Sequence, residues 1–188
     1  GAPDRSAPAA ACATTGPPGS ATAAERLSRL ELRRVGYGHP DALLLVEEVQ
    51  AEYVRRYGGR DETPLDPLMF EPPDGSFFVG YLDGRPVATG AWRRSTVEAL
   101  GSDRTAEVKR MYVAPAARGL GLARRVLAHL EADAASYGAE VVVLETGTPQ
   151  PEAMALYESS GYTRIPGFGF YQDSPMSRCY ARRLPTTA

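Results

Sequence analysis

The chain has 188 residues, of which 43% are hydrophobic and 23% are charged, and its formal net charge is −2. A length of this order suits one globular domain whose core needs no covalent staple. The small net charge argues against a general nucleic-acid-binding protein, and no apolar stretch approaches the about 20 residues of a membrane span.

The first 24 residues differ in composition from the rest of the chain. They contain no Val, Ile, Leu, Met or aromatic side chain, so they cannot bury enough apolar surface to offset the entropy lost on ordering. We predict a disordered tail over residues 1–24, with a transit-like segment as the alternative. Cys12 in this tail and Cys179 near the other end suggest no disulfide framework, which favours a cytoplasmic protein.

The first two elements of the predicted domain are a strand and a helix. Residues 27–35 alternate apolar and charged side chains, which is the period of a half-buried strand. His39 and Pro40 then precede a segment, residues 41–57, whose apolar side chains fall on one helical stripe. We therefore predict that a domain over residues 25–188 begins with a strand followed by an amphipathic helix.

A loop and a hairpin follow. Residues 60–74 are rich in proline and are predicted to form a loop. Asp83 and Gly84 are typical of a two-residue turn, and they separate the strand-like runs 76–82 and 86–94. We expect these two runs to pair as antiparallel neighbours.

The remaining elements alternate between strands and helices. Residues 106–113 have a strand pattern, residues 124–137 have a helical pattern, and a continuous apolar run within 140–145 predicts a strand covered on both faces. The last predicted elements are a helix over residues 151–160 and strands over residues 162–165 and 178–184. This order predicts an α/β fold with one mixed sheet and helices on both of its faces.

A glycine-bearing turn, residues 118–123, joins the strand over 106–113 to the following helix. Backbone N–H groups at a helix N-terminus, together with the helix dipole, form an anion-binding site. The dinucleotide fingerprint G-x-G-x-x-G is excluded because Arg124 stands where its third glycine belongs, and the chain contains no Walker-type loop. The alternative reading is a tight connection that binds nothing.

Two motifs, one in this turn and one further along the chain, resemble signatures of the GNAT acetyltransferases. The pattern R-x-x-G-x-A over residues 118–123 resembles that family's motif A, and A-x-x-L-Y-E-x-x-G-Y over residues 153–162 is similar to its second signature. The resemblance covers about residues 27–184. It implies the GNAT fold, with a mixed, mostly antiparallel sheet of about seven strands, and it implies acetyl-CoA as the donor substrate without a metal.

The resemblance also implies how acetyl-CoA is held. The N–H groups of the turn would bind its pyrophosphate, with Gly119 and Gly121 allowing close approach of the backbone. Arg118, Arg124 and Arg125 would add positive charge. The cofactor-binding residues implied are Met111, Tyr112, Val113, Arg118, Gly119, Leu120, Gly121, Leu122, Ala123, Arg124 and Gln150.

The pantetheine arm of acetyl-CoA would then lie along the strand that precedes the turn. Backbone groups of Met111 and Val113 would hold it as an extra strand, and the Met111 N–H is the candidate donor to the thioester carbonyl. Gln150 departs from the family pattern, because many members have Asn three residues before the signature alanine. Gln offers the same amide groups on a longer stem, so its contact with the arm is left open.

Acetyl transfer to an amine requires a neutral amine and a proton for the departing thiolate. The resemblance implies Tyr157 as the general acid, with a packed core aromatic as the alternative. Glu107 is the first candidate base, against a surface carboxylate paired with Lys109 or Arg110. Glu145 is the second candidate, and a water chain without a dedicated base is the remaining alternative. Because the family commonly has a bulge in this strand, strand alternation does not decide which way Glu107 points.

The acceptor is expected to be a small-molecule amine, with a protein or peptide N-terminus as the alternative. Its pocket is expected from residues 53–74 and 166–177, with Phe70, Glu71, Trp92 and Tyr112 as further wall candidates. The alternative for each of these residues is simple packing, and for Trp92 it is a position in the core. Such a pocket would be acidic and lined by aromatic rings, which suits a cationic amine. A non-catalytic acyl-CoA-binding module and an interaction domain without a cofactor are competing functions. We expect neither nucleic acid nor membrane as a partner, and a homodimer is a candidate state because dimers are common in the family.

Overall fold

The computed structural model describes residue 19 and residues 21–186, which contain one seven-stranded sheet in the order β1-β2-β3-β4-β5-β7-β6. The strands are β1 (Glu31–Val35), β2 (Gly75–Leu82), β3 (Arg85–Ser95), β4 (Thr105–Val113), β5 (Val141–Gly147), β6 (Thr163–Ile165) and β7 (Ser177–Arg183). Only the β4–β5 pair among these neighbours is parallel. The predicted mixed, mostly antiparallel sheet is therefore confirmed.

Helices cover both faces of this sheet, as predicted. The α-helices are α1 (Ala23–Ser28), α2 (Pro40–Tyr57), α3 (Leu122–Ser136) and α4 (Pro151–Ser159), and short 3-10 helices span Pro67–Phe70 and Pro115–Ala117. On one face, α2 packs Leu45 and Val49 into a cluster with Phe77. On the other face, Leu127 and Leu130 of α3 pack against a cluster that includes Trp92 and residues of α4. No helix within the described residues is long and apolar enough to cross a membrane.

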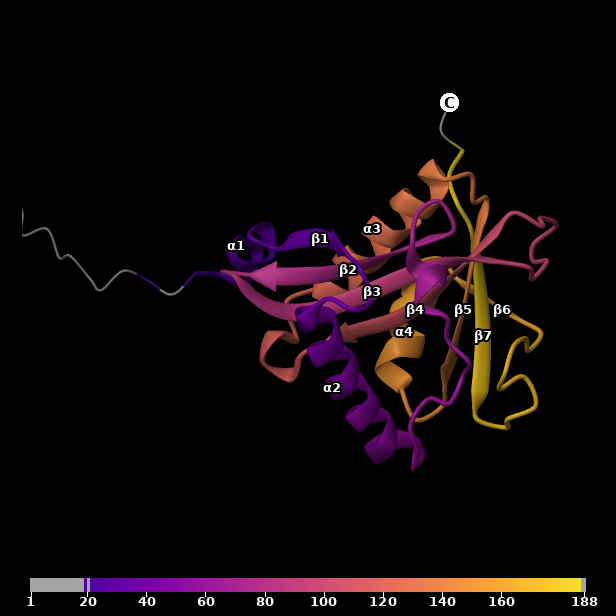
Figure 1. Cartoon of the computed structure of the whole chain (residues 1–188), viewed down its shortest axis with the longest axis horizontal. Helices are drawn as coiled ribbons and strands as arrows, with labels where there is room; N and C mark the ends of the chain where they lie inside the picture. The colour runs from indigo at the N-terminus through magenta and orange to yellow at the C-terminus, as the bar shows by residue number, and fades with distance from the viewer. Residues whose placement is uncertain (1–18, 20, 187–188) are drawn as a thin grey trace, which may run out of the picture.

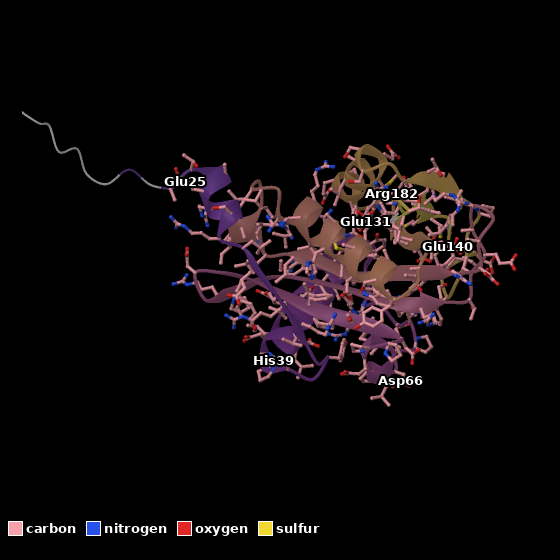
Figure 2. All side chains as sticks on the ribbon, turned by 90° about the horizontal axis from the view of Figure 1, so that it is seen from above. Glu25, His39, Asp66, Glu131, Glu140 and Arg182 are labelled. Carbon is pink, nitrogen blue, oxygen red and sulfur yellow. The ribbon has the colours of Figure 1, made fainter. Side chains whose placement is uncertain are left out.

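The side view shows this layering directly. In Figure 2, His39 at the start of α2 and Glu131 on α3 lie on opposite sides of the sheet. Glu131 lies beside Arg182 of β7, whose guanidinium donates to its carboxylate over 2.8 Å. The hydroxyl of Tyr162 donates to the same carboxylate over 2.8 Å, so this buried acid is held by two partners beneath α3.

The start of the domain differs from the prediction. A strand was expected over residues 27–35, but a helix occupies Ala23–Ser28 and the strand begins at Glu31. Thr22 and Glu25 form a capping box, in which each side chain accepts a hydrogen bond from the other residue's backbone N–H. The predicted tail over residues 1–24 falls mostly outside the described residues, and its last two residues, Ala23 and Ala24, are the first two of α1.

A β-bulge lies in β4, as the family resemblance implied. Thr89 of β3 pairs with Tyr112 and Ala91 pairs with Lys109, so one extra residue is inserted in β4, where Arg110 has a φ of 56°. A bulge places two successive side chains on the same side of a sheet. Lys109 and Arg110 therefore both line the pocket described below, whereas Met111 packs under α3.

The parallel pair β4–β5 separates halfway along its length. Its register runs from Thr105 opposite Val141 to Val108 opposite Leu144, and beyond that point the two strands are not paired with each other. In Figure 1, β1 to β4 extend toward the left of the view, whereas the antiparallel pair β5 and β7 extends toward its lower part. The sheet is therefore open between residues 109–113 and 145–147, next to the glycine-bearing turn.

Candidate active site

The glycine-bearing turn leaves a series of backbone donors free. Gly119 and Gly121 have φ values of 80° and 82°, a conformation that side chains other than glycine rarely adopt. Gly121 is the N-cap of α3 and has no side chain to occupy the first N–H groups of the helix. Within the described part of the chain, the N–H groups of residues 119–124 have no hydrogen-bond partner. The turn therefore has the geometry of an anion site.

Two of the three arginines expected to add charge have protein partners. The Arg118 guanidinium donates to the Val113 carbonyl and to the Glu52 carboxylate, both over 2.9 Å. Arg124 donates to the hydroxyls of Ser159 and Ser160 at the end of α4. The backbone of the turn, more than these guanidinium groups, is thus left available for an anion.

A cavity of about 420 Å³ adjoins the opening between β4 and β5. Its walls come from the end of α2, residues 57–63 after it, the sheet, and residues 169–177. This volume is within the usual range for small-molecule sites. The two predicted wall segments thus contribute in part, and the aromatic lining is confirmed by Tyr53, Tyr57, Phe170 and Tyr171.

The four further wall candidates do not line the cavity, which agrees with the alternative reading of them as packing residues. Phe70, Trp92 and Tyr112 are buried in the core, and Glu71 does not line the cavity. A 3-10 turn directs Phe70 under α2 and away from the cavity. There its ring stacks on Tyr37 and meets Phe77 edge to face. The lining is also not simply acidic, because it contains arginine and lysine side chains from β3 and β4.

Glu107 lies in the cavity, but cations occupy both of its carboxylate oxygens. Arg93 donates to Oε1 through Nε and Nη2 over 3.0 and 2.9 Å. The Lys109 ammonium lies 3.7 Å from Oε2. The Glu107 carboxylate thus faces the pocket and is paired with Lys109, as its alternative reading expected, while its role as a base stays a prediction.

Glu145 faces the same cavity from β5, one residue beyond the last residue paired with β4. It forms no ion pair with any described residue. Burial, followed by the nearby charge of Glu107, raises the pKa of its carboxyl to about 7. A carboxylate with a pKa near the working pH is suited to accept a proton from a substrate.

Tyr157 lies on α4 and belongs to the core, 5.8 Å from the ring of Tyr162 and 6.2 Å from that of Tyr180. Burial, with smaller effects of Tyr53 and Tyr57, raises the pKa of its hydroxyl. The hydroxyl therefore keeps its proton at neutral pH, and it makes no hydrogen bond to the described residues. The structure brings Glu107 and Glu145 together in the cavity, whereas Tyr157 is not part of its wall.

Gln150 reaches the pocket through a different contact from the one expected. Its Oε1 accepts a hydrogen bond from the Tyr57 hydroxyl over 2.8 Å, which joins the N-terminus of α4 to the end of α2. Its amide NH₂ donates to no described residue, and a role toward the pantetheine arm stays a prediction.

One buried ion pair of the pocket was not predicted from the sequence. Arg110 donates to Asp61 over 2.7 Å, and its Nε is buried without a partner among the described residues. Burial opposes ionisation of Asp61, but hydrogen bonds from Thr63 and Arg110 lower its pKa to about 2. Asp61 lies in a loop without a recognisable motif, so no sequence pattern indicated this contact. Among the described residues, no His, Cys, Asp and Glu side chains gather into a group that could hold a metal ion.

Comparisons with known proteins agree with this arrangement. Residues 46–162 match the family model described as the acetyltransferase (GNAT) family. An IAA acetyltransferase from Azospirillum brasilense is 35% identical over 133 residues, which cover 71% of this chain and 84% of that protein.

Solved structures have the same fold. One from Klebsiella pneumoniae, proposed to be an acyl-CoA N-acyltransferase, has a TM-score of 0.66 and 26% identity over 82% of this chain and 97% of that one. The yncA protein of Salmonella typhimurium, solved with its cofactor acetyl-CoA, has a TM-score of 0.62 and 18% identity over 85% of this chain and 96% of that one.

Proposed function

Because the chain belongs to the GNAT family of acetyltransferases, we propose that it transfers the acetyl group of acetyl-CoA directly to the amine of a small molecule held in the 420 Å³ cavity. The observation that carries this proposal is the position of the cavity. It adjoins the opening between β4 and β5 and contains, in Glu145, a carboxyl group poised to take up a proton.

The donor is held by groups that the protein leaves free. The N–H groups of residues 119–124 fit the pyrophosphate of acetyl-CoA, because they converge at a helix N-terminus without protein partners. The backbone of Met111 and Val113 would hold the pantetheine arm in the opening beside β4, flanked by Tyr112 and by Leu120 and Leu122 of the turn. Acetyl-CoA supplies a thioester, whose C–S bond breaks as the C–N bond to the acceptor forms.

Glu145 is the base that the geometry supports best. An ordinary ammonium group has a pKa near 10, so the acceptor arrives protonated and must lose a proton before it can attack. Glu145 is unpaired and faces the cavity, whereas Glu107 is neutralised by Arg93 and Lys109. Glu107, the first candidate from the sequence, stays in the proposal as the group whose charge raises the pKa of Glu145.

Two further groups complete the reaction. The Met111 N–H would donate to the carbonyl oxygen on which negative charge develops. Tyr157 would give its proton to the departing thiolate, because its hydroxyl is protonated and unpaired. The acceptor nitrogen loses two protons as it changes from ammonium to amide. One of them restores the Tyr157 hydroxyl after it has protonated the thiolate, and the other leaves through Glu145 to solvent.

Two measurements test the proposal. CoA and acetyl-CoA should raise the melting temperature of the protein, since a ligand that binds only the native state stabilises it. Release of CoA thiol should then be followed across a panel of small amines and short peptides. No thermal shift at saturating CoA would rule out the donor site, and turnover of peptides alone would replace the small-molecule acceptor by a peptide N-terminus.

A further inference from the structure

Lys109 is the only lysine in the chain, which uses arginine at its other 20 cationic positions. It lines the acceptor cavity and its side chain is only 13% exposed. An arginine binds in a planar, forked geometry, whereas a lysine ammonium is a compact point charge. The single lysine of the chain is thus located in the cavity that we propose for the acceptor, where a compact charge leaves room for a small charged ligand.

The floor of the cavity presents opposite charges in a row across three strands. Arg93 of β3 pairs in register with Glu107 of β4, and Lys109 follows on the same face of β4. Val108 and Leu144 are the last pair of β4 and β5, so Lys109 and Glu145 lie at the start of the opening between these strands, and both line the cavity. The row therefore runs from cations on β3 and β4 to the carboxyl group of Glu145 on β5.

These charges do not balance once an amine has bound. Arg93 and Lys109 share the single carboxylate of Glu107, which leaves one positive charge in excess. Arg110 and Arg60 add nothing to this excess, because Asp61 and Glu47 neutralise them. Glu62 also belongs to the lining, but it is exposed to solvent. Glu145 can offset the excess only while its own charge is not engaged by a substrate ammonium group.

Buried charges are stable only when they are paired. A bound ammonium group that takes up Glu145 leaves the excess charge without a counter-ion at Lys109, whose side chain is mostly buried. An acid group on the same substrate would restore the balance. Lys109 and Glu145 line one cavity, so the acid and amino groups of a single small molecule can meet both of them.

We propose that the acceptor is an amino acid, whose carboxylate is bound by Lys109 and Arg93 while its amino group faces Glu145. This inference rests on the proposed acetyltransferase function and narrows its substrate from amines in general to amines that also carry a carboxylate. The tyrosines and Phe170 of the wall would contact the remainder of the molecule.

The test compares matched acceptors that differ in the acid group. L-leucine and L-phenylalanine are set against 3-methylbutylamine and phenethylamine, their decarboxylated counterparts, at saturating acetyl-CoA. Because a hydrogen-bonded charge pair in a shielded site is strong, we expect kcat/KM to favour the amino acids by roughly ten- to hundredfold. Lys109→Met should abolish this preference, and Lys109→Arg should retain most of it.

Two controls keep the outcomes distinct. Arg104→Met, at an exposed arginine outside the cavity, should leave the preference unchanged. In protein labelled with ¹³C at the lysine side chain, the single signal should shift on titration with the amino acid and not with the decarboxylated amine, which tests binding without any variant. Equal kcat/KM for both classes, or an equal loss of both in Lys109→Met, overturns the inference. Failure of every amine to release thiol would instead reject the proposed function.

Discussion

The guanidinium of Arg118 donates a hydrogen bond to the carboxylate of Glu52 over 2.9 Å and so ties the glycine-bearing turn to α2. Glu52 is buried and also pairs with Arg56 at 3.3 Å. Its neighbour in the chain, Tyr53, lines the acceptor cavity. One ion-pair network therefore connects the proposed donor site with the wall of the acceptor site.

Arg118→Met should weaken this connection. Glu52 would keep only Arg56, so we expect the free energy of unfolding to fall by about 1 kcal/mol, because the pair is partly exposed to solvent. Binding of acetyl-CoA should weaken only severalfold, since backbone groups supply most of the site. Arg124→Met, which removes contacts to two serine hydroxyls, is the matched control for calorimetric titration and thermal unfolding.

Gly119→Ala should reduce affinity for acetyl-CoA by about tenfold. Gly119 has a φ of 80°, and an added Cβ would meet no atom within 4 Å, so the effect comes from backbone strain that redirects the N–H groups. Gly84→Ala in the β2–β3 turn is the control, because its φ of 78° and open surroundings are equivalent. Both variants should lose about 1–2 kcal/mol of stability. Equal affinities in the two variants would show that the turn does not bind the donor.

Glu145→Gln should lower kcat/KM by about 10² to 10⁴, the usual contribution of a general base. In the wild type, kcat/KM should rise with pH and level off above a pKa near 7, because only the ionised carboxylate can accept the proton. Glu107→Gln removes the charge that helps to raise this pKa, so the rise should move to lower pH while activity remains. If the variant at Glu107 is the inactive one, the two roles are reversed.

Tyr157→Phe should lower kcat by about 10² or more and leave the KM for acetyl-CoA nearly unchanged, because the lost group is the proton donor to the thiolate. Tyr162→Phe is the comparison, since that hydroxyl donates to Glu131 and lies in the same core. It should lower stability with little effect on kcat. Thermal unfolding of both variants separates a loss of chemistry from a loss of packing.

Asp61→Asn should destabilise the protein at neutral pH by about 2 kcal/mol, because it leaves the buried Arg110 without its counter-ion. The pKa of Asp61 is lowered to about 2 in the folded state, from an ordinary value of 3.8. Its contribution is therefore present above about pH 4 and is lost as the pH falls toward 2. Urea unfolding at pH 7, 5, 4 and 3 should show the gap between wild type and variant narrowing only below pH 4.

Much of the fold could be predicted because local patterns and tertiary structure agree. The apolar run of residues 141–144 is buried on both faces of β5, and Asp83 and Gly84 form the turn between β2 and β3. The helix α1 was missed, although Thr22 and Glu25 have the spacing of a capping box. An Ala-rich segment without large apolar side chains hid that short motif.

The electrostatics of the site could not be read from the sequence in the same way. Glu145 ranked behind Glu107 because the difference between them depends on Arg93 and Lys109, which reach Glu107 from β3 and from the bulged part of β4. The pairing of Arg110 with Asp61 joins residues 49 positions apart and depends on the bulge. The pKa values and ion pairs of these residues depend on burial and on neighbours from other strands. Neither can be recognised from a local pattern in the sequence.

The separation of β4 from β5 gives this sheet edges in its interior. Free edges normally lie on the outside of a sheet, where they can pair with another polypeptide. Here the edges of residues 109–113 and 145–147 face each other, so each edge is covered by the other and is not open to another polypeptide. Both edges offer backbone groups to the pantetheine arm that we propose to lie between them, which is extended and has its own amides. Pairing with these edges would therefore favour an acyl donor whose arm is extended and carries amide groups.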